Sequence, residues 1–333
     1  MANFFSNLLS KFIPQKPSTE VPSVAPNIPS TNESLAREVL HRLSYASETN
    51  LVAAVKQFQL DQGLKADGAL GVNTLARIRS YEEKLKLAPK EMKQMRRFRA
   101  THYYVAAEVD YTSPKIPIYD IHKKVVCEVP ASFFCNAALE GTGKLKDGRL
   151  INVGGKNYVD VDPALYAPAA EVYKKHVAYM QSKGRTPRPS RYFGVDYVDG
   201  KVLRAQPFNV VENLGKGFGI GKKGIPYETN RTVASDQGLY GTSEPRFKGK
   251  GGLWPAGTKA WVADLAGEHD HDGYVVSADV GGGIFGAHFD FFVGTKEHVM
   301  DYPVRSNAIT YVWFEGIEDR IAPDYEYGLY DRR

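Results

Sequence analysis

The chain has 333 residues and is 43% hydrophobic, which is enough for a folded core divided between two or three domains. Its 43 basic and 38 acidic residues leave a net charge of +5, a mild excess that favours an anionic polymer such as nucleic acid or bacterial cell wall. Two cysteines, Cys127 and Cys135, exclude a disulfide framework and lack a zinc-site spacing, so buried free thiols are the default and one bond between neighbouring strands is the alternative.

The first 31 residues are predicted to form a tail and a linker. The stretch "MANFFSNLLSKFI" holds a short apolar run without a preceding basic residue or a clear cleavage site, so it is a poor secretory signal. Residues 14–31 are rich in Pro and Ser, which indicates an extended linker. No segment reaches the roughly 18 apolar residues that a transmembrane helix needs. We therefore expect a protein that is made in the cytoplasm.

Residues 32–86 are predicted to form a compact unit of three short helices. Asn32 is expected to cap the first helix, Glu33–Ser44, and a second helix is expected from about Asn50 to Gly63. Asp67-Gly68 is a strong turn signal, and a third helix follows it. No constellation of catalytic residue types lies in this unit, which indicates a binding module rather than an enzyme.

This helical unit resembles the peptidoglycan-binding three-helix domain that is attached to many wall hydrolases. The positions that match the family in order and spacing are Ala54-Val55, Phe58-Gln59, Gly63-Leu64, Asp67-Gly68, Gly71, Thr74 and Ile78. The resemblance implies that the unit binds the wall, and we assign to this wall-binding module the residues Phe58, Gln59, Asp67, Gly68 and Thr74. A generic helical bundle is the alternative.

Residues 87–125 are expected to form a charged connector followed by lead-in strands. The basic run Lys90–Arg99 is interpreted as a solvated helix face, because no nucleic-acid-binding motif accompanies it. Many short strands with glycine turns follow, which is typical of a small barrel. We place this barrel at 126–318, with an insertion at about 155–223 that includes a helix near 168–182, and a C-terminal tail at 319–333.

The stretch "SADVGGGIFGAHFDFFVG", residues 277–294, carries the strongest candidate for chemistry. In its second strand His288, Asp290 and Phe292 share one face by alternation, and the intervening residues face the core. Asp290 therefore lies in mid-strand beside large apolar groups, where loss of hydration raises the pKa of a carboxyl group towards that of a general acid. From position alone, a structural carboxylate that ties down a loop is an equal alternative.

The same stretch resembles the signature of the 3D domain, a family named for three aspartates and shared by MltA-type lytic transglycosylases. The matching positions are Asp279, Gly281-Gly282, Gly286 and Asp290, with Asp236 in "RTVASD" as the third aspartate and Pro255–Thr258 as a Pro-x-Gly-Thr element. "GTGKLKDGR", residues 141–149, is similar to the family's opening barrel strand. The long segment between Asp236 and Pro255 departs from the family. The resemblance implies a six-stranded double-psi β-barrel and, with the helical module, an α+β multidomain fold.

The resemblance also implies a peptidoglycan lytic transglycosylase, a lyase that cleaves the β-1,4 bond between MurNAc and GlcNAc and leaves a 1,6-anhydro end. Asp290 is then the single catalytic residue, first as general acid and then as general base, whereas ordinary glycosidases use two carboxyl groups. Its expected supporting residues are Asp236, Asp279 and His288. The expected substrate-binding residues are Thr142, Gly281, Gly282, Tyr192 and Tyr197.

Two other functions remain open at this stage. Expansin-type proteins share the barrel and a His-Phe-Asp element like that at 288–290, so a non-catalytic wall-binding protein is one alternative. A water-using inverting glycosidase is the other, with Asp236 or Asp279 holding water roughly 6.5–9.5 Å from Asp290.

Peptidoglycan glycan strands are the expected partner, and nucleic acid and stable membrane insertion are not expected. We expect no cofactor and no metal, because "EHDHDG" at 268–273 holds metal-ligand residue types but fits a polar hairpin tip better. The chain is expected to be a monomer that acts on the cell wall or in the periplasm, after release in the manner of a phage endolysin or export by another route.

Overall fold

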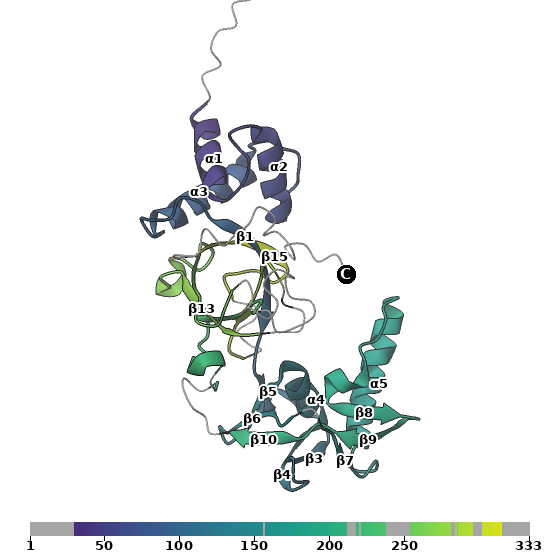
Figure 1. Cartoon of the computed structure of the whole chain (residues 1–333). Coiled ribbons are helices and arrows are strands. Elements are labelled where there is room, and N and C mark those ends of the chain that lie inside the picture. Colours follow the sequence, from purple (N-terminus) through teal and green to yellow (C-terminus); the bar gives the residue numbers. More distant parts are fainter. Residues whose placement is uncertain are drawn as a thin grey trace, which may run out of the picture.

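The computed structural model describes residues 30–155, 157–211, 218–219, 221–237, 254–280, 284, 286–295 and 302–314. These residues form a three-helix module, a closed barrel and a second lobe of helices and small sheets, which follow one another from top to bottom in Figure 1. The α+β multidomain fold is therefore confirmed. Gly281, Gly282, the segment 238–253 and the C-terminal tail lie outside the described residues.

The helical module consists of α1 (Thr31–Arg42), α2 (Leu51–Asp61) and α3 (Val72–Lys86). Ser30 caps α1 by accepting a hydrogen bond from the Glu33 backbone N–H at 3.3 Å, and Asn50 caps α2 in the same way. The prediction that Asn32 caps the first helix is wrong, because the helix already begins at Thr31.

Six strands close the barrel in the order β1-β14-β11-β13-β12-β15. They are β1 (Arg96–Tyr103), β11 (Thr232–Ala234), β12 (Lys259–Val262), β13 (Tyr274–Asp279), β14 (His288–Phe292) and β15 (Ala308–Phe314). The pairs β1/β14 and β11/β13 are parallel and the other neighbours are antiparallel, so the sheet is mixed. The six-stranded barrel is confirmed, and its double-psi connectivity stays a prediction from the resemblance.

The first barrel strand is β1, so the predicted barrel start at residue 126 is wrong, as is the interpretation of Lys90–Arg99 as a helix face. Phe98 and Ala100 are fully buried, whereas the neighbouring arginines point away from the core. Arg97 is only 12% exposed, because it pairs with Asp61 of α2 at 3.3 Å. The helical module therefore covers part of a charged strand, although its composition alone predicts that it is exposed to solvent.

A second lobe is inserted between β1 and β11. Its helices are α4 (Ala131–Glu140) and α5 (Ala167–Ser182). Its strands are β2 (Ala106–Ala107), β3 (Lys115–Tyr119), β4 (Val125–Pro130), β5 (Thr142–Lys144), β6 (Leu150–Val153), β7 (Val159–Asp160), β8 (Val195–Val198), β9 (Lys201–Ala205) and β10 (Phe208–Val211). Short 3-10 helices lie at η1 (Glu108–Asp110), η2 (Ser190–Phe193), η3 (Lys222–Gly224) and η4 (Glu268–Asp270), of which the first two belong to the lobe.

The lobe corrects the predicted insertion, which begins at β2 rather than near residue 155. "GTGKLKDGR" supplies β5, which pairs with β2 and β6 and is not a barrel strand. Short strands next to glycine turns have the same sequence pattern in a barrel and in the small sheets of the lobe. The pattern therefore did not show to which of the two β5 belongs. Cys127 on β4 and Cys135 on α4 are free thiols, and burial raises the pKa of Cys135 to about 12.

The helical module and the barrel share one hydrophobic core, whereas the lobe has its own. At the shared boundary the hydroxyl groups of Tyr45 and Tyr311 are 2.8 Å apart, and the rings of Tyr81 and Tyr311 pack edge to face at 4.9 Å. The Tyr81 hydroxyl also donates to Asp264 Oδ1 at 2.6 Å. The module is therefore packed firmly against the barrel rather than tethered to it.

Candidate active site

Asp290 lies on β14, between β1 and β11, at the end of β1 that leads into the lobe. It is opposite Thr101 on one side and Ala234 on the other. Its side chain is partly exposed, but the surrounding protein removes enough hydration to raise its pKa from 3.8 to about 7. The Thr101 hydroxyl donates to Oδ1 at 2.7 Å and lowers the pKa, the charge of Asp279 raises it, and Arg99 lowers it. Near neutral pH this carboxyl group can give up a proton and take one back.

A short hydrogen-bond chain supports Asp290. Thr101 Oγ1 lies 2.8 Å from Nε2 of His288, whose side chain is buried. The threonine hydroxyl has one hydrogen, so when it donates to Asp290 it accepts from Nε2. His288 thereby fixes the direction of the Thr101 hydroxyl. The alternation predicted for this strand is confirmed, since Phe289 and Phe291 lie in the barrel core.

Asp279 ends β13 and lies close to two tyrosines. It accepts a hydrogen bond from the backbone N–H of Val280 at 2.8 Å and bonds the Tyr227 hydroxyl. Burial raises the pKa of Tyr227 and Tyr103, and the charge of Asp279 raises both further. The charge of Asp290 also acts on Tyr103. Both phenols therefore keep their protons beside the two carboxyl groups.

Asp236, the third predicted aspartate, is buried and is bonded to the loop before β14. Its Oδ2 accepts a hydrogen bond from the backbone N–H of Gly286 at 2.9 Å, and its carbonyl accepts from Trp254 N at 3.1 Å. Gln237 beside it donates to the carbonyl of Asp279 at 2.8 Å. Asp236 therefore fastens the loop that precedes β14, and its support of Asp290 is indirect.

Glu140, the last residue of α4, is a site residue that the sequence prediction missed. Burial and, to a smaller extent, the charge of Asp290 raise its pKa to about 7, against the lowering effect of Arg188. A carboxylate in the last turn of a helix opposes the helix dipole, and this was the one sequence signal that could have found it. The lobe thus places a second titratable carboxyl group within electrostatic range of Asp290.

The predicted substrate-binding residues are scattered over the lobe. The Thr142 hydroxyl donates to Asn152 Oδ1 at 3.0 Å, and Tyr197 packs on the ring of Tyr173 at 5.1 Å. Tyr192 is 55% exposed and is the aromatic side chain of this set that is open to a ligand. Gly281 and Gly282 lie outside the described residues.

Three of the five residues assigned to the wall-binding module lie inside it rather than on its surface. Phe58, Gln59 and Thr74 are buried, and the Gln59 amide donates to Thr74 Oγ1 at 2.9 Å and accepts from Gly68 N at 2.8 Å. Gln59 also donates to Asp67 Oδ1 at 3.1 Å. These side chains hold the turn between α2 and α3, so the three buried residues have a structural role in the module, and the wall contacts of this set stay a prediction.

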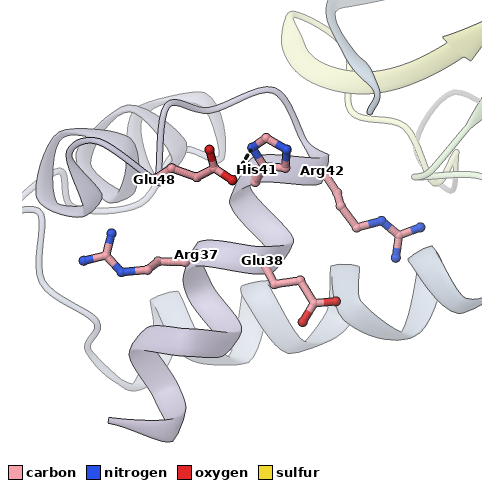
Figure 2. Close-up of a pocket in the computed structure, with 5 residues that line it drawn as sticks. All are labelled: Arg37, Glu38, His41, Arg42 and Glu48. Atoms are coloured by element: carbon pink, nitrogen blue, oxygen red, sulfur yellow. Dashed lines mark ion pairs between the residues drawn. The ribbon is translucent and has the colours of Figure 1, made fainter. Parts of the chain in front are cut away.

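A pocket on the module lies on α1 and the loop after it (Figure 2). It has a volume of about 610 Å³ and is lined by Arg37, Glu38, His41, Arg42 and Glu48. His41 Nδ1 lies 3.6 Å from Glu48. The pocket lies on the helical module, whereas Asp290 lies on β14 of the barrel. Its mixed charges suit a polar ligand.

The histidine-rich hairpin tip is tied down by its own hydrogen bonds. His271 Nδ1 accepts from Gly273 N at 2.8 Å, and Asp272 pairs with Arg231. Within the part of the chain that the structure describes, no group of three His, Cys, Asp or Glu residues is arranged to hold a metal ion. In the same part, no helix is both long enough and apolar enough to cross a membrane.

Two segments of the chain match family models. Residues 252–312 match the 3D domain, and residues 41–78 match the family described as "Putative peptidoglycan binding domain". The chain thus carries a 3D domain that includes Asp279 and Asp290, and a peptidoglycan-binding module. No curated protein matches the chain.

Several solved structures are similar at low identity. MltA from Escherichia coli is 15% identical with a TM-score of 0.37, covering 86% of this chain and 90% of that chain. The lytic transglycosylase LtgG of Burkholderia pseudomallei is 13% identical with a TM-score of 0.33, covering 85% and 91%. A membrane-bound lytic murein transglycosylase from Agrobacterium tumefaciens is 14% identical with a TM-score of 0.36, covering 83% and 97%. All three TM-scores are below 0.5, so these likenesses say nothing about the function of this chain.

Proposed function

We propose that this protein is a peptidoglycan lytic transglycosylase in which Asp290 acts first as general acid and then as general base. The observation that carries the proposal is the Asp290 carboxyl group, which lies in the 3D domain with a pKa of about 7. The matched peptidoglycan-binding module supports the cell wall as substrate and as place of action.

In the first step, protonated Asp290 gives its proton to the glycosidic oxygen between MurNAc and GlcNAc, and the C1–O bond breaks. In the second step, the Asp290 carboxylate takes the proton of the muramic C6 hydroxyl, whose oxygen bonds to C1 and closes the 1,6-anhydro ring. Asp290 ends protonated, as it began, and no water is consumed. A pKa near the working pH suits both steps, because each requires a different protonation state.

The surrounding residues supply what one carboxyl group needs for both steps. The Thr101 hydrogen bond stabilises the carboxylate, while burial and the charge of Asp279 favour the protonated form. Asp236 is unsuited to hold an attacking water, because it is buried and bonded to Gly286. This weakens the inverting-glycosidase alternative in the form that uses Asp236.

The test is digestion of purified peptidoglycan by the protein and by Asp290→Asn, followed by mass spectrometry of the soluble products. We expect products about 18 Da lighter than hydrolytic muropeptides, since no water is added, and their loss with Asp290→Asn. Reducing-end products would instead indicate a hydrolase. Binding to the wall without any soluble product would contradict catalysis and leave an expansin-like binder.

A further inference from the structure

One strongly basic surface of the lobe has no part in the proposed chemistry. Between residues 172 and 195, which run from α5 to the start of β8, the chain has no Asp or Glu. The same segment contains Lys174, Lys175, Lys183, Arg185, Arg188 and Arg191. We call Arg185, Arg188, Arg191 and the exposed Tyr192 the basic face.

The basic face is held in place rather than left as a loose loop. The backbone N–H of Arg188 donates to His176 Nε2 at 3.2 Å, and the Tyr173 hydroxyl donates to the carbonyl of Arg188, also at 3.2 Å. The rings of His176 and Phe193 lie 4.5 Å apart and link α5 to η2. The backbone is thereby fixed while the Arg188 side chain stays exposed. The Arg191 side chain is 65% exposed and lies 4.0 Å from the Asp196 carboxylate, just outside the segment.

The basic face adjoins the side of the lobe that carries Glu140. Gly194, at the end of η2, approaches α4 so closely that an added Cβ would lie 2.6 Å from Cβ of Ala138. Ala138 is two residues before Glu140, whose pKa is raised by the charge of Asp290 and lowered by that of Arg188. After Glu140 the chain enters β5, which pairs with β2, and the backbone N–H of Val105 before β2 donates to the carbonyl of Gly294 after β14 at 2.9 Å. An extended substrate at Asp290 would therefore reach the basic face.

We propose that the basic face binds the carboxylates of peptidoglycan stem peptides, so that the enzyme prefers peptide-bearing glycan to naked glycan. The inference rests on the proposed function, because the stem peptide hangs from MurNAc, the sugar at the cleaved bond. Arginine forks match carboxylates in geometry and charge. The exposed ring of Tyr192 adds a flat surface beside Arg191 on which a sugar can stack. Nucleic acid is disfavoured, since no nucleic-acid-binding motif accompanies these arginines.

The experiment compares peptide-bearing glycan strands with strands whose peptides have been removed by an amidase, both free of teichoic acid. The proteins are the full chain, Arg188→Gln/Arg191→Gln, and the control Lys115→Gln/Lys124→Gln, which removes two exposed charges from the β3–β4 hairpin of the same lobe. We expect the unchanged chain to prefer peptide-bearing strands in kcat/KM by about five- to tenfold. The arginine variant should lose this preference, and the control should keep it.

Binding is measured in parallel with Asp290→Asn as the background, so that the inference is tested even if no cleavage occurs. Equal binding to both substrates, or an arginine variant that keeps the preference, would overturn the inference while leaving the proposed function intact. Absence of anhydro products from both substrates would overturn the proposed function, and the binding ratio would still decide the inference. Competition by purified teichoic acid, but not by free stem peptide, would assign the basic face to phosphate and also overturn it.

Discussion

Thr101 donates one hydrogen bond to Asp290, and removal of this bond should shift the pKa of Asp290 in a defined direction. Thr101→Val deletes the donor to Oδ1 and so raises the pKa of Asp290 above about 7. We expect kcat/KM on peptidoglycan to fall about tenfold. The loss of activity on the alkaline side, where Asp290 loses the proton that it must donate, should move to higher pH. Thr101→Ser keeps the hydroxyl and should retain both values. An unchanged pH profile in the valine variant would show that the bond does not tune Asp290.

The raised pKa of Asp290 also predicts a pH-dependent stability. The folded state binds this proton more tightly than the unfolded state, with a pKa of about 7 instead of 3.8. The free energy of unfolding therefore falls as the pH rises from about 4 to about 7. Asp290→Asn should be more stable than the unchanged chain at pH 8, by on the order of 2 kcal/mol, and this gain should vanish near pH 4.

Urea unfolding at the two pH values measures this difference. Asp147→Asn is the control, because Arg149 lowers the pKa of this exposed aspartate and its loss brings no gain at pH 8. Equal stability of Asp290→Asn and the unchanged chain at pH 8 would contradict a raised pKa of the Asp290 carboxyl group in the folded state.

The residues of the candidate site differ in how far the sequence could predict them. Strand alternation placed Asp290 and His288 on one face, because both lie on a single regular strand. Thr101 and Glu140 could not be found in this way, since the first belongs to a strand far away in sequence and the second to the inserted lobe. Asp236 was found by resemblance, but only the packing shows that it holds a loop.

At the scale of elements, the contact between α3 and the barrel makes the helical module part of the folded core. The Tyr81 hydroxyl donates to Asp264 at 2.6 Å, and Lys84 donates to Glu268 at 2.7 Å. Tyr81→Phe leaves the ring packing intact but removes this buried hydrogen bond, so we expect a loss of about 1–2 kcal/mol. Tyr179→Phe on α5, where the side chain is 60% exposed, should change the stability little. Equal stability of the two variants would contradict a firm module–barrel contact.

Contacts between distant segments also explain which elements could not be predicted from the sequence. β12 to β15 were predictable because their apolar residues alternate or run together between turns. The arginines of β1 look solvated until α2 supplies Asp61 as a partner for Arg97. Likewise α4, an apolar helix, lies within the segment that was assigned to the barrel, because its burial depends on α5 and the small sheets of the lobe. For both β1 and α4, burial depends on contacts with residues that are distant in sequence.

At the scale of the whole molecule, two cores predict two units of unfolding. One core joins the helical module to the barrel, and the other belongs to the lobe alone. We therefore expect two calorimetric transitions rather than three. Phe58→Ala, in the module, should destabilise the unit that includes the barrel by about 3–5 kcal/mol, and Phe134→Ala should affect the lobe transition by a similar amount.

Tryptophan fluorescence can follow the unfolding of the barrel and so test this division into two units. Trp254 and Trp261 are both buried in the barrel, far in sequence from Phe58. If the module and barrel are one unit, Phe58→Ala lowers the midpoint of the tryptophan transition, and Phe134→Ala leaves it in place. If Phe58→Ala leaves the midpoint of the tryptophan transition unchanged, the module unfolds by itself. The wall-binding module would then be a tethered anchor, whereas a shared transition means that wall binding fixes the orientation of the barrel, and with it Asp290, on the glycan.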